Sequence, residues 1–401
     1  MAKYWCCWKS KQLNIELSYR LPTSLGGLFP MHIFSIRKRK NKGKNIRKNF
    51  CVNLKGRFKL KNLEKAGEIQ HHVRLTAPEI ANIWTQYQND TMAVCIYKYM
   101  IKIVENPAIH SIMELALKFA EGHIPKIKDY FTVENFPIPH GFTDDDVNLD
   151  APRLFSDELC LTYTYIMSVH GLAGYAAALT TNMRSDIREY YVKCQNETME
   201  LFNRSLDLML EKGTVSRPPF INPPEEYGFV QSKNFMQGIL GGERTLNVIE
   251  ISNIYWDLKK AQLDKAICIA FAQVAKSQEV KDLIWRGVKI GDKQIEILET
   301  LLSQDHLSSP KSEDTEVTNS TIAPFSDRLM MYHKLLIIST QIGLYGTAIG
   351  TCQRYDLGTH FYRFMMEASD FAKDGFKLMI KNNWVEQVPL ADDREKLSGK
   401  R

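Results

Sequence analysis

The sequence predicts an all-α protein made of two tandem four-helix bundles, and three observations support this fold class. The tripeptide Phe155-Ser156-Asp157 returns as Phe325-Ser326-Asp327, each time just after an Ala-Pro pair. Downstream residues such as Tyr175 and Tyr345 return at a constant separation of 170 positions. Apolar residues recur at helical spacing through both copies. We therefore interpret the chain as two copies of one helical unit laid end to end.

The first predicted bundle spans residues 75–220. Its first helix begins after Thr76, because Pro78 suits a first helical turn and Glu79 can complete a capping box with the threonine. The same kinds of signal set the remaining boundaries of this bundle. They are Asn106-Pro107 between helices one and two, Ser156 before helix three, Ser185-Asp186 before helix four and Gly213 after it.

A long connection separates the second and third predicted helices. It contains Phe136–Gly141 and the acidic stretch Asp144–Asp150, and it reaches to Ser156. A connection of roughly twenty residues can run the length of a bundle, so helices two and three can run parallel to each other. We therefore predict a ferritin-like bundle with a helix 2–helix 3 crossover rather than a simple up-down-up-down bundle.

The second predicted bundle, residues 245–390, repeats these features. Asn247 and Glu250 form a capping box 171 positions after that of the first copy, and Ser277 stands where Asn106 predicts a cap. The crossover returns between Ser308 and Thr321, and the last helix is predicted to end at Asn382-Asn383. Residues 221–244 are a predicted linker with a short helix, and residues 391–401 are a predicted C-terminal tail.

The charge of the chain is divided unequally. Residues 1–66 hold 17 of the 52 Lys and Arg residues but two of the 46 acids, so the remainder carries 35 basic and 44 acidic residues. The basic segment can be a nucleic-acid or anionic-membrane arm, or a disordered or non-native extension. We prefer the extension, because its charges show no regular aromatic interleaving and no binding motif.

The eight cysteines are scattered and form no C-x-x-C pair. Isolated thiols within apolar helical stretches are typical of a reducing compartment rather than of a disulfide framework. The N-terminal residues contain no continuous apolar segment that would suit a secretory signal. We therefore expect a cytoplasmic protein.

A di-metal site is the first chemistry to consider in a ferritin-like bundle. Such a site needs a Glu from each of two helices and a Glu-x-x-His from each of the other two, and neither predicted bundle contains Glu-x-x-His. The candidate ligands in the first copy are Glu79, Glu121, His123 and Glu197. Glu79 is explained by capping, and His123 is replaced by Gln294 in the second copy, so we interpret that pair as an interior polar group.

Other sites are equally weakly supported. Asp144, Asp146, Asn148 and Asp150 alternate as in a calcium loop, but the Gly and the Glu that such a loop requires are missing. The uncharged runs Leu159–Met183 and Leu335–Gln353 are long enough for a membrane span, but each coincides with the third helix of a predicted bundle. We find no nucleophile elbow and no phosphate-binding glycine loop.

Several segments resemble a known family. The matching residues are Leu75–Ile80, Gly141-Phe142-Thr143 with Asp146-Val147-Asn148, Ala151–Asp157, Pro324–Met331 and Ile380–Trp384. In this order they are similar to the duplicated bacterial family called domain of unknown function 3231, which is common in spore-forming bacteria. The resemblance covers about residues 72–396. It implies a ferritin-like bundle in each half and a distant kinship with spore coat F proteins, without any assigned activity.

Our preferred hypothesis is a non-enzymatic structural or interaction protein that is associated with sporulation. The alternative is a ferritin-like metal-binding protein or oxidoreductase that uses Glu79, Glu121, His123 and Glu197, or their equivalents in the second copy. A membrane-associated helical protein is a weaker alternative. We assign no catalytic, cofactor-binding or metal-binding residue and expect no cofactor. Other spore or coat proteins and a second copy of the chain are the candidate partners; nucleic acid and membrane are not expected.

Overall fold

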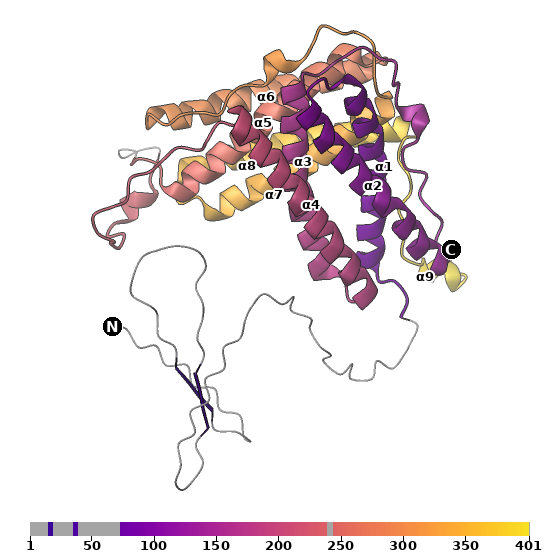
Figure 1. Ribbon diagram of the computed structural model, residues 1–401, viewed down its shortest axis with the longest axis horizontal. Helices are drawn as coiled ribbons and strands as arrows, with labels where there is room; N and C mark the ends of the chain where they lie inside the picture. The colour runs from indigo at the N-terminus through magenta and orange to yellow at the C-terminus, as the bar shows by residue number, and fades with distance from the viewer. Residues whose placement is uncertain (1–14, 19–34, 39–72, 239–243, 401) are drawn as a thin grey trace. The chain divides into compact units, whose positions relative to one another are not determined.

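The computed structural model describes residues 15–18, 35–38, 73–238 and 244–400 (Figure 1). The chain divides into two compact units, residues 1–72 and 73–401. In the first unit, β1 (Ile15–Ser18) pairs antiparallel with β2 (Ser35–Lys38). That residues 1–66 are a basic, disordered or non-native extension stays a prediction. The rest of that segment, including most of its basic run, lies outside the described residues.

The second unit is helical. Eight helices of 25 to 28 residues form most of it: α1 (Ala77–Ile103), α2 (Pro107–Val133), α3 (Asp157–Thr181), α4 (Ser185–Lys212), α5 (Val248–Val274), α6 (Gln278–Gln304), α7 (Asp327–Thr351) and α8 (Tyr355–Lys381). The short helices are η1 (Asp144–Asp146), η2 (Lys233–Met236), η3 (Asp314–Glu316) and α9 (Arg394–Leu397). The all-α fold with two repeated halves is therefore confirmed for this unit. The domain limits within it stay a prediction.

Each half contains four helices that pack in the same ring order. In the first half α1 packs against α2, α2 against α4, α4 against α3 and α3 against α1, and α5 to α8 repeat this pattern. Asp157 at the start of α3 accepts hydrogen bonds from the backbone N–H groups of Glu105 and Asn106, next to the start of α2. Asp327 makes the equivalent bonds in the second half. Because α2 and α3 begin at the same end, they run parallel, as the long crossover predicts.

Most helix ends follow the local signals in the sequence. Asn247 Oδ1 accepts from the N–H of Glu250 at 3.0 Å, and Glu250 Oε2 accepts from the N–H of Asn247 at 3.0 Å, which completes a capping box. Gly213 ends α4 with φ of 68°, a conformation that favours glycine. Ser277 differs from the prediction: it occupies the N-cap position of α6, but its side chain makes no capping bond.

The two halves contact each other reciprocally through their crossovers. Isolated antiparallel bridges join Val147 to Phe325 and Phe155 to Val317. Val147 and Val317 are equivalent residues of the two copies, and so are Phe155 and Phe325, so the two bridges are equivalent contacts. Tyr163 and His333 are themselves such counterparts, and their Oη and Nε2 atoms lie 2.8 Å apart. The halves are therefore arranged about an internal pseudo-two-fold axis, as in a symmetric dimer whose subunits have been fused.

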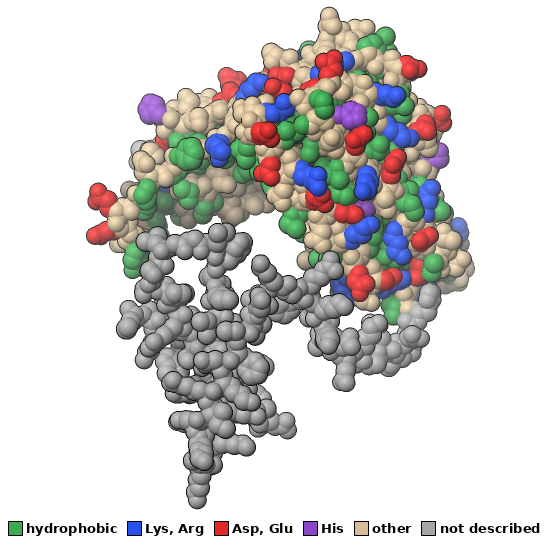
Figure 2. All heavy atoms as spheres, viewed as in Figure 1, with side chains coloured by type: hydrophobic (Ala, Val, Ile, Leu, Met, Phe, Trp, Pro, Cys, Tyr) green, Lys and Arg blue, Asp and Glu red, His purple; other side chains and the backbone are tan. Residues whose placement is uncertain are grey.

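The main hydrophobic core continues through both halves, from Met92 in α1 to Met379 in α8, and a smaller cluster fills the other end of the first half. The uncharged runs predicted as third helices lie in α3 and α7. Among the described residues, no helix has the length and apolar character of a membrane span. Figure 2 shows acidic and basic side chains interspersed on the visible face of the helical unit, rather than gathered by sign.

Candidate functional site

The centre of the first half holds a buried histidine between two acids. His123, on the inward face of α2, is 3% exposed. Its Nδ1 lies 3.2 Å from Asp90 Oδ2 on α1, and its Nε2 lies 2.9 Å from Glu197 Oε2 on α4. The two carboxylates thus bind opposite edges of one imidazole ring.

The surroundings of His123 favour its charged form. The rings of Tyr175 and Tyr190 pack edge-on against the imidazole, with centroids 6.1 and 6.0 Å away. Burial opposes a charge there, but the carboxylate of Asp90 outweighs it and raises the pKa of His123 to about 11. A protonated imidazole has a hydrogen on each nitrogen, so it offers no lone pair to a metal ion.

The four candidate metal ligands of the first half do not come together. His123 and Glu197 are in contact, but Glu121 is exposed on the outer face of α2. Glu79 lies at the start of α1, where its Oε1 accepts from the N–H groups of Met183 and Arg184. Within the parts of the chain that the structure describes, no three His, Cys, Asp or Glu side chains are placed to hold a metal ion. That the protein has no catalytic, cofactor-binding or metal-binding residue stays a prediction.

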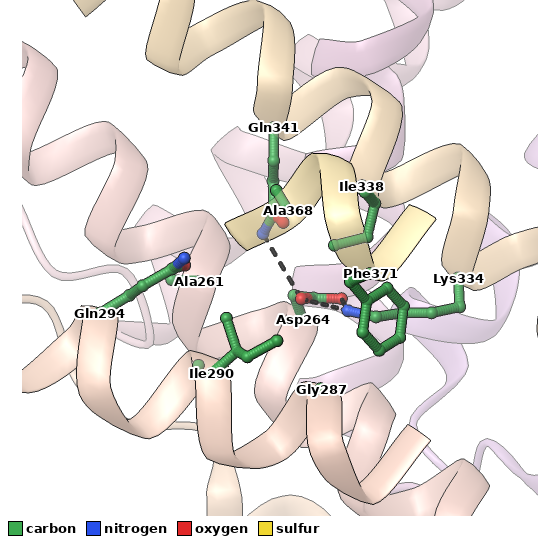
Figure 3. A pocket seen from close by; sticks show the side chains of 11 residues that line it. Ala261, Asp264, Gly287, Ile290, Gln294, Lys334, Ile338, Gln341, Ala368 and Phe371 are labelled. Atoms are coloured by element: carbon green, nitrogen blue, oxygen red, sulfur yellow. Dashed lines mark hydrogen bonds and ion pairs between the residues drawn. The ribbon is translucent and has the colours of Figure 1, made fainter. Parts of the chain in front are cut away.

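The second half has a different ion pair at its centre. Lys334 on α7 places its Nζ 2.6 Å from Asp264 Oδ1 on α5, and Gln341 Nε2 lies 3.5 Å from Asp264 Oδ2 (Figure 3). Burial disfavours the ammonium, but Asp264 compensates and raises the pKa of Lys334. Sequence reasoning missed this pair, because Lys334 directly precedes an uncharged run and Asp264 stands beside Lys265 in a charged stretch of α5, where an acid is expected to be solvated.

A small cavity of about 10 Å³ adjoins this ion pair. It is lined by side chains from all four helices of the half, including Ala261, Gln294 and Phe371 (Figure 3). A space of this size holds about one water molecule and no organic substrate. Gln294 accepts a hydrogen bond from the hydroxyl of Tyr345 at 2.9 Å, so the predicted interior polar role is observed for its oxygen. Its Nε2 has no hydrogen-bond partner among the described residues.

The two centres are not copies of one site. His123 corresponds to Gln294, and Lys334 corresponds to Thr164, at separations of 171 and 170. The buried cation therefore comes from the second helix in the first half and from the third helix in the second half. In both cases it is a protonated side chain that is already paired with a carboxylate.

A repeated set of polar residues connects the first helix of each half to the turn between its third and fourth helices. The set consists of Glu79, Arg184 and Asp186 in the first half, and Glu250, Arg354 and Asp356 in the second. Glu250 Oε1 accepts from the N–H groups of Gln353 and Arg354, as Glu79 does in the first half. Arg354 is paired with Asp356 at 2.6 Å, and the corresponding Arg184 is paired with Asp186 at 2.8 Å. Capping was the predicted role of Glu79 and Glu250. That they also tie the first helix to the turn between the third and fourth helices could not be predicted from local signals.

Comparison with known proteins identifies the family. The family model described as "Protein of unknown function (DUF3231)" matches residues 64–226 and 234–397, one match for each repeat. The chain belongs to this family. Among solved structures, it is similar to a protein of Bacillus halodurans described as a "putative spore coat protein", with 18% sequence identity. That match covers 37% of this chain and 98% of the other, with a TM-score of 0.34. None of the curated proteins matches.

In this DUF3231 protein the acidic crossover has structural contacts of its own. Asp144 pairs with Lys98 at 2.7 Å, and Asp146 Oδ1 accepts from the hydroxyl of Ser326 at 2.6 Å. Asn148 Oδ1 accepts from the N–H of Asp150. These side chains cap a short helix and tie the crossover to the other half, which is a role that the alternating acids did not reveal.

Proposed function

We propose that this DUF3231 protein is a non-enzymatic structural or interaction protein. The observation that carries the proposal is that the centres of the two halves hold different ion pairs, each formed between side chains of the same half. A catalytic or metal centre that the duplication had preserved would repeat its reactive residues, whereas His123 corresponds to Gln294 and Lys334 to Thr164. We also propose that each half is a ferritin-like bundle.

The chemistry of the centres also supports this reading. Asp264 and Lys334 neutralise each other, and the adjoining cavity of about 10 Å³ holds no more than one water molecule. Catalysis needs a reactive group within hydrogen-bond reach of a bound substrate. Lys334 and His123 are each already paired with a carboxylate, which favours a structural role over a reactive one.

We further propose that the protein acts in sporulation, with other spore or coat proteins as its partners. This part comes from the family resemblance and concerns the setting rather than the chemistry. A tagged copy of the full chain, expressed in a spore-forming Bacillus, tests it. We expect the protein to purify with the spores after the mother cells lyse. Its full recovery in the mother-cell lysate would contradict this part of the proposal.

A metal-binding protein is the second candidate, because carboxylates of Asp90 and Glu197 lie 3.2 and 2.9 Å from the two ring nitrogens of the buried His123, although these three side chains are not placed to hold one ion in common. The test is the metal content of the full-length protein after anaerobic incubation with Fe(II) or Mn(II) and removal of free metal. We expect far less than one ion per chain.

Two variants make this measurement specific. Glu197→Gln alters the cluster, and Glu367→Gln changes the corresponding residue of the second half as a matched control. One or more ions per chain in the native protein and in Glu367→Gln, but not in Glu197→Gln, would replace the structural proposal by the metal-binding one.

A further inference from the structure

A surface groove of about 440 Å³ lies on the first half, between α1, α2 and the crossover around η1. Pockets for small organic ligands in proteins measure about 300–1,000 Å³. Seven residues line the groove: Lys98, Ile101, Lys102, Leu117, Asp144, Val147 and Leu149. None of the residues that line the groove belongs to the cluster of Asp90, His123 and Glu197 at the centre of this half.

The lining combines an apolar surface with an excess of positive charge. Ile101, Leu117, Val147 and Leu149 supply the apolar part. Lys98 and Lys102 are one helical turn apart on α1, so their side chains lie on the same face. Lys98 is engaged by Asp144 at 2.7 Å, whereas Lys102 is exposed and forms no ion pair with any residue that the structure describes. The lining therefore carries a net charge of one positive unit.

The second half provides an internal comparison. Ile269 and Gln273 stand where the first half has Lys98 and Lys102, at a separation of 171. Gln273 Nε2 donates to the backbone carbonyls of Thr318, at 2.9 Å, and of Ser320. Gln273 thus holds its crossover directly, whereas no bond joins Lys102 to the corresponding crossover among the residues that the structure describes, and there the tie comes from Lys98 instead. The two lysines are a property of the first half alone.

We propose that this groove binds a small aliphatic carboxylate. The carboxylate pairs with the ammonium of Lys102, and the hydrocarbon chain lies along Ile101, Leu117 and Leu149. A single net positive charge suits a monoanion, and the apolar walls reward a chain of several methylenes. This inference stands apart from the proposed structural function, since it uses none of the residues at the bundle centres.

Calorimetric titration of the full-length protein with sodium decanoate, below the concentration at which it forms micelles, tests the proposal. We expect saturable binding of one ligand per chain. Octanoate should bind more weakly, by about fourfold for each methylene removed. Decylamine, which has the same chain and the opposite charge, should not bind at this site.

Three substitutions locate the site. Lys102→Gln introduces the residue found at the equivalent position of the second half and should weaken decanoate binding about three- to tenfold. Leu149→Glu, at an exposed position of the crossover, should abolish it by placing an acid beside the ligand. Lys289→Gln removes a charge from the exposed face of α6 and should leave binding unchanged. Thermal unfolding of each variant shows whether the fold is retained.

Several outcomes would overturn the proposal. Decanoate could fail to show saturable binding, or decylamine could bind equally well. Lys102→Gln could match Lys289→Gln in affinity while both remain folded, which would place the ligand elsewhere. The metal-content and spore-association experiments bear on the proposed function and leave this inference untouched, because different residues are involved.

Discussion

Asp264 and Lys334 each depend on the other, because both side chains are buried. The side chain of Lys334 is 1% exposed and that of Asp264 is 9% exposed. Removing one partner leaves an uncompensated charge in the core, whereas removing both leaves an apolar interior. We therefore expect that loss of one residue lowers the free energy of unfolding strongly, whereas loss of both lowers it much less.

Lys334→Met alone should lower the free energy of unfolding by about 3–5 kcal/mol, because it leaves Asp264 buried and unpaired. The double variant Lys334→Met with Asp264→Leu should recover most of that loss. Urea denaturation of the full chain, followed by circular dichroism, measures both values. Additive losses in the double variant would show that the two residues do not act as a pair.

His123 is expected to make the stability of the first half depend on pH above pH 6.5. Its folded-state pKa of about 11 lies above the value of 6.5 for an unperturbed histidine. The stabilisation that comes from the raised pKa is fully present below pH 6.5 and is lost as the pH rises toward 11. Within this window the native state holds one proton more than the unfolded state.

The native protein should therefore lose stability relative to His123→Gln as the pH increases from 6.5 to 9.5. The slope of the difference should approach about 1.4 kcal/mol per pH unit for one proton. Unfolding by urea at a series of pH values, with both proteins in the same buffers, checks this expectation. Parallel profiles for the two proteins would mean that His123 is not held in its charged form.

For single residues, the sequence predicts which side chains face the interior better than it predicts which side chains they contact. Helical periodicity predicts that His123 and Gln294 face the interior, and both do. It does not predict that Asp90 or Asp264 is buried, because an acid within a helix is ordinarily solvated and its partner lies on another helix. Such partners become visible only when the packing of the helices is known.

The helices themselves are largely predictable, because the signals that end them are local. Thr76, Asn106, Ser156 and Gly213 act within a few residues of their own position, and each marks a boundary in the structure. Ser277 is the exception: the N–H groups at the start of α6 bond to Asp327, a residue 50 positions away. The four-residue strands β1 and β2 give too short a pattern to recognise in the sequence.

The crossovers show how far reasoning about elements can go. Their length correctly predicts that α2 and α3 run parallel, since it follows from the distance that a connection must span. It does not predict that each crossover pairs with the other half. The bridge between Phe155 and Val317 joins elements whose only common signal in the sequence is the repeat itself.

At the scale of the molecule, duplication was evident from the sequence and the closure of the two copies on each other was not. A separation of 170 says that two segments are equivalent, whereas the contact between Tyr163 and His333 shows that equivalent residues meet. Repeated units can also form a string of independent domains, and the sequence does not distinguish these arrangements. The continuous core and the reciprocal bridges make residues 73–401 one structural unit.

The central claim is that the two halves form one fused scaffold, and differential scanning calorimetry of the full-length protein tests it most directly. Compared with the native protein, His123→Gln perturbs the first half and Lys334→Met perturbs the second. We predict that residues 73–401 unfold in a single transition, which either substitution shifts as a whole to lower temperature. Two separate transitions, of which each substitution lowers one and leaves the other in place, would contradict the account.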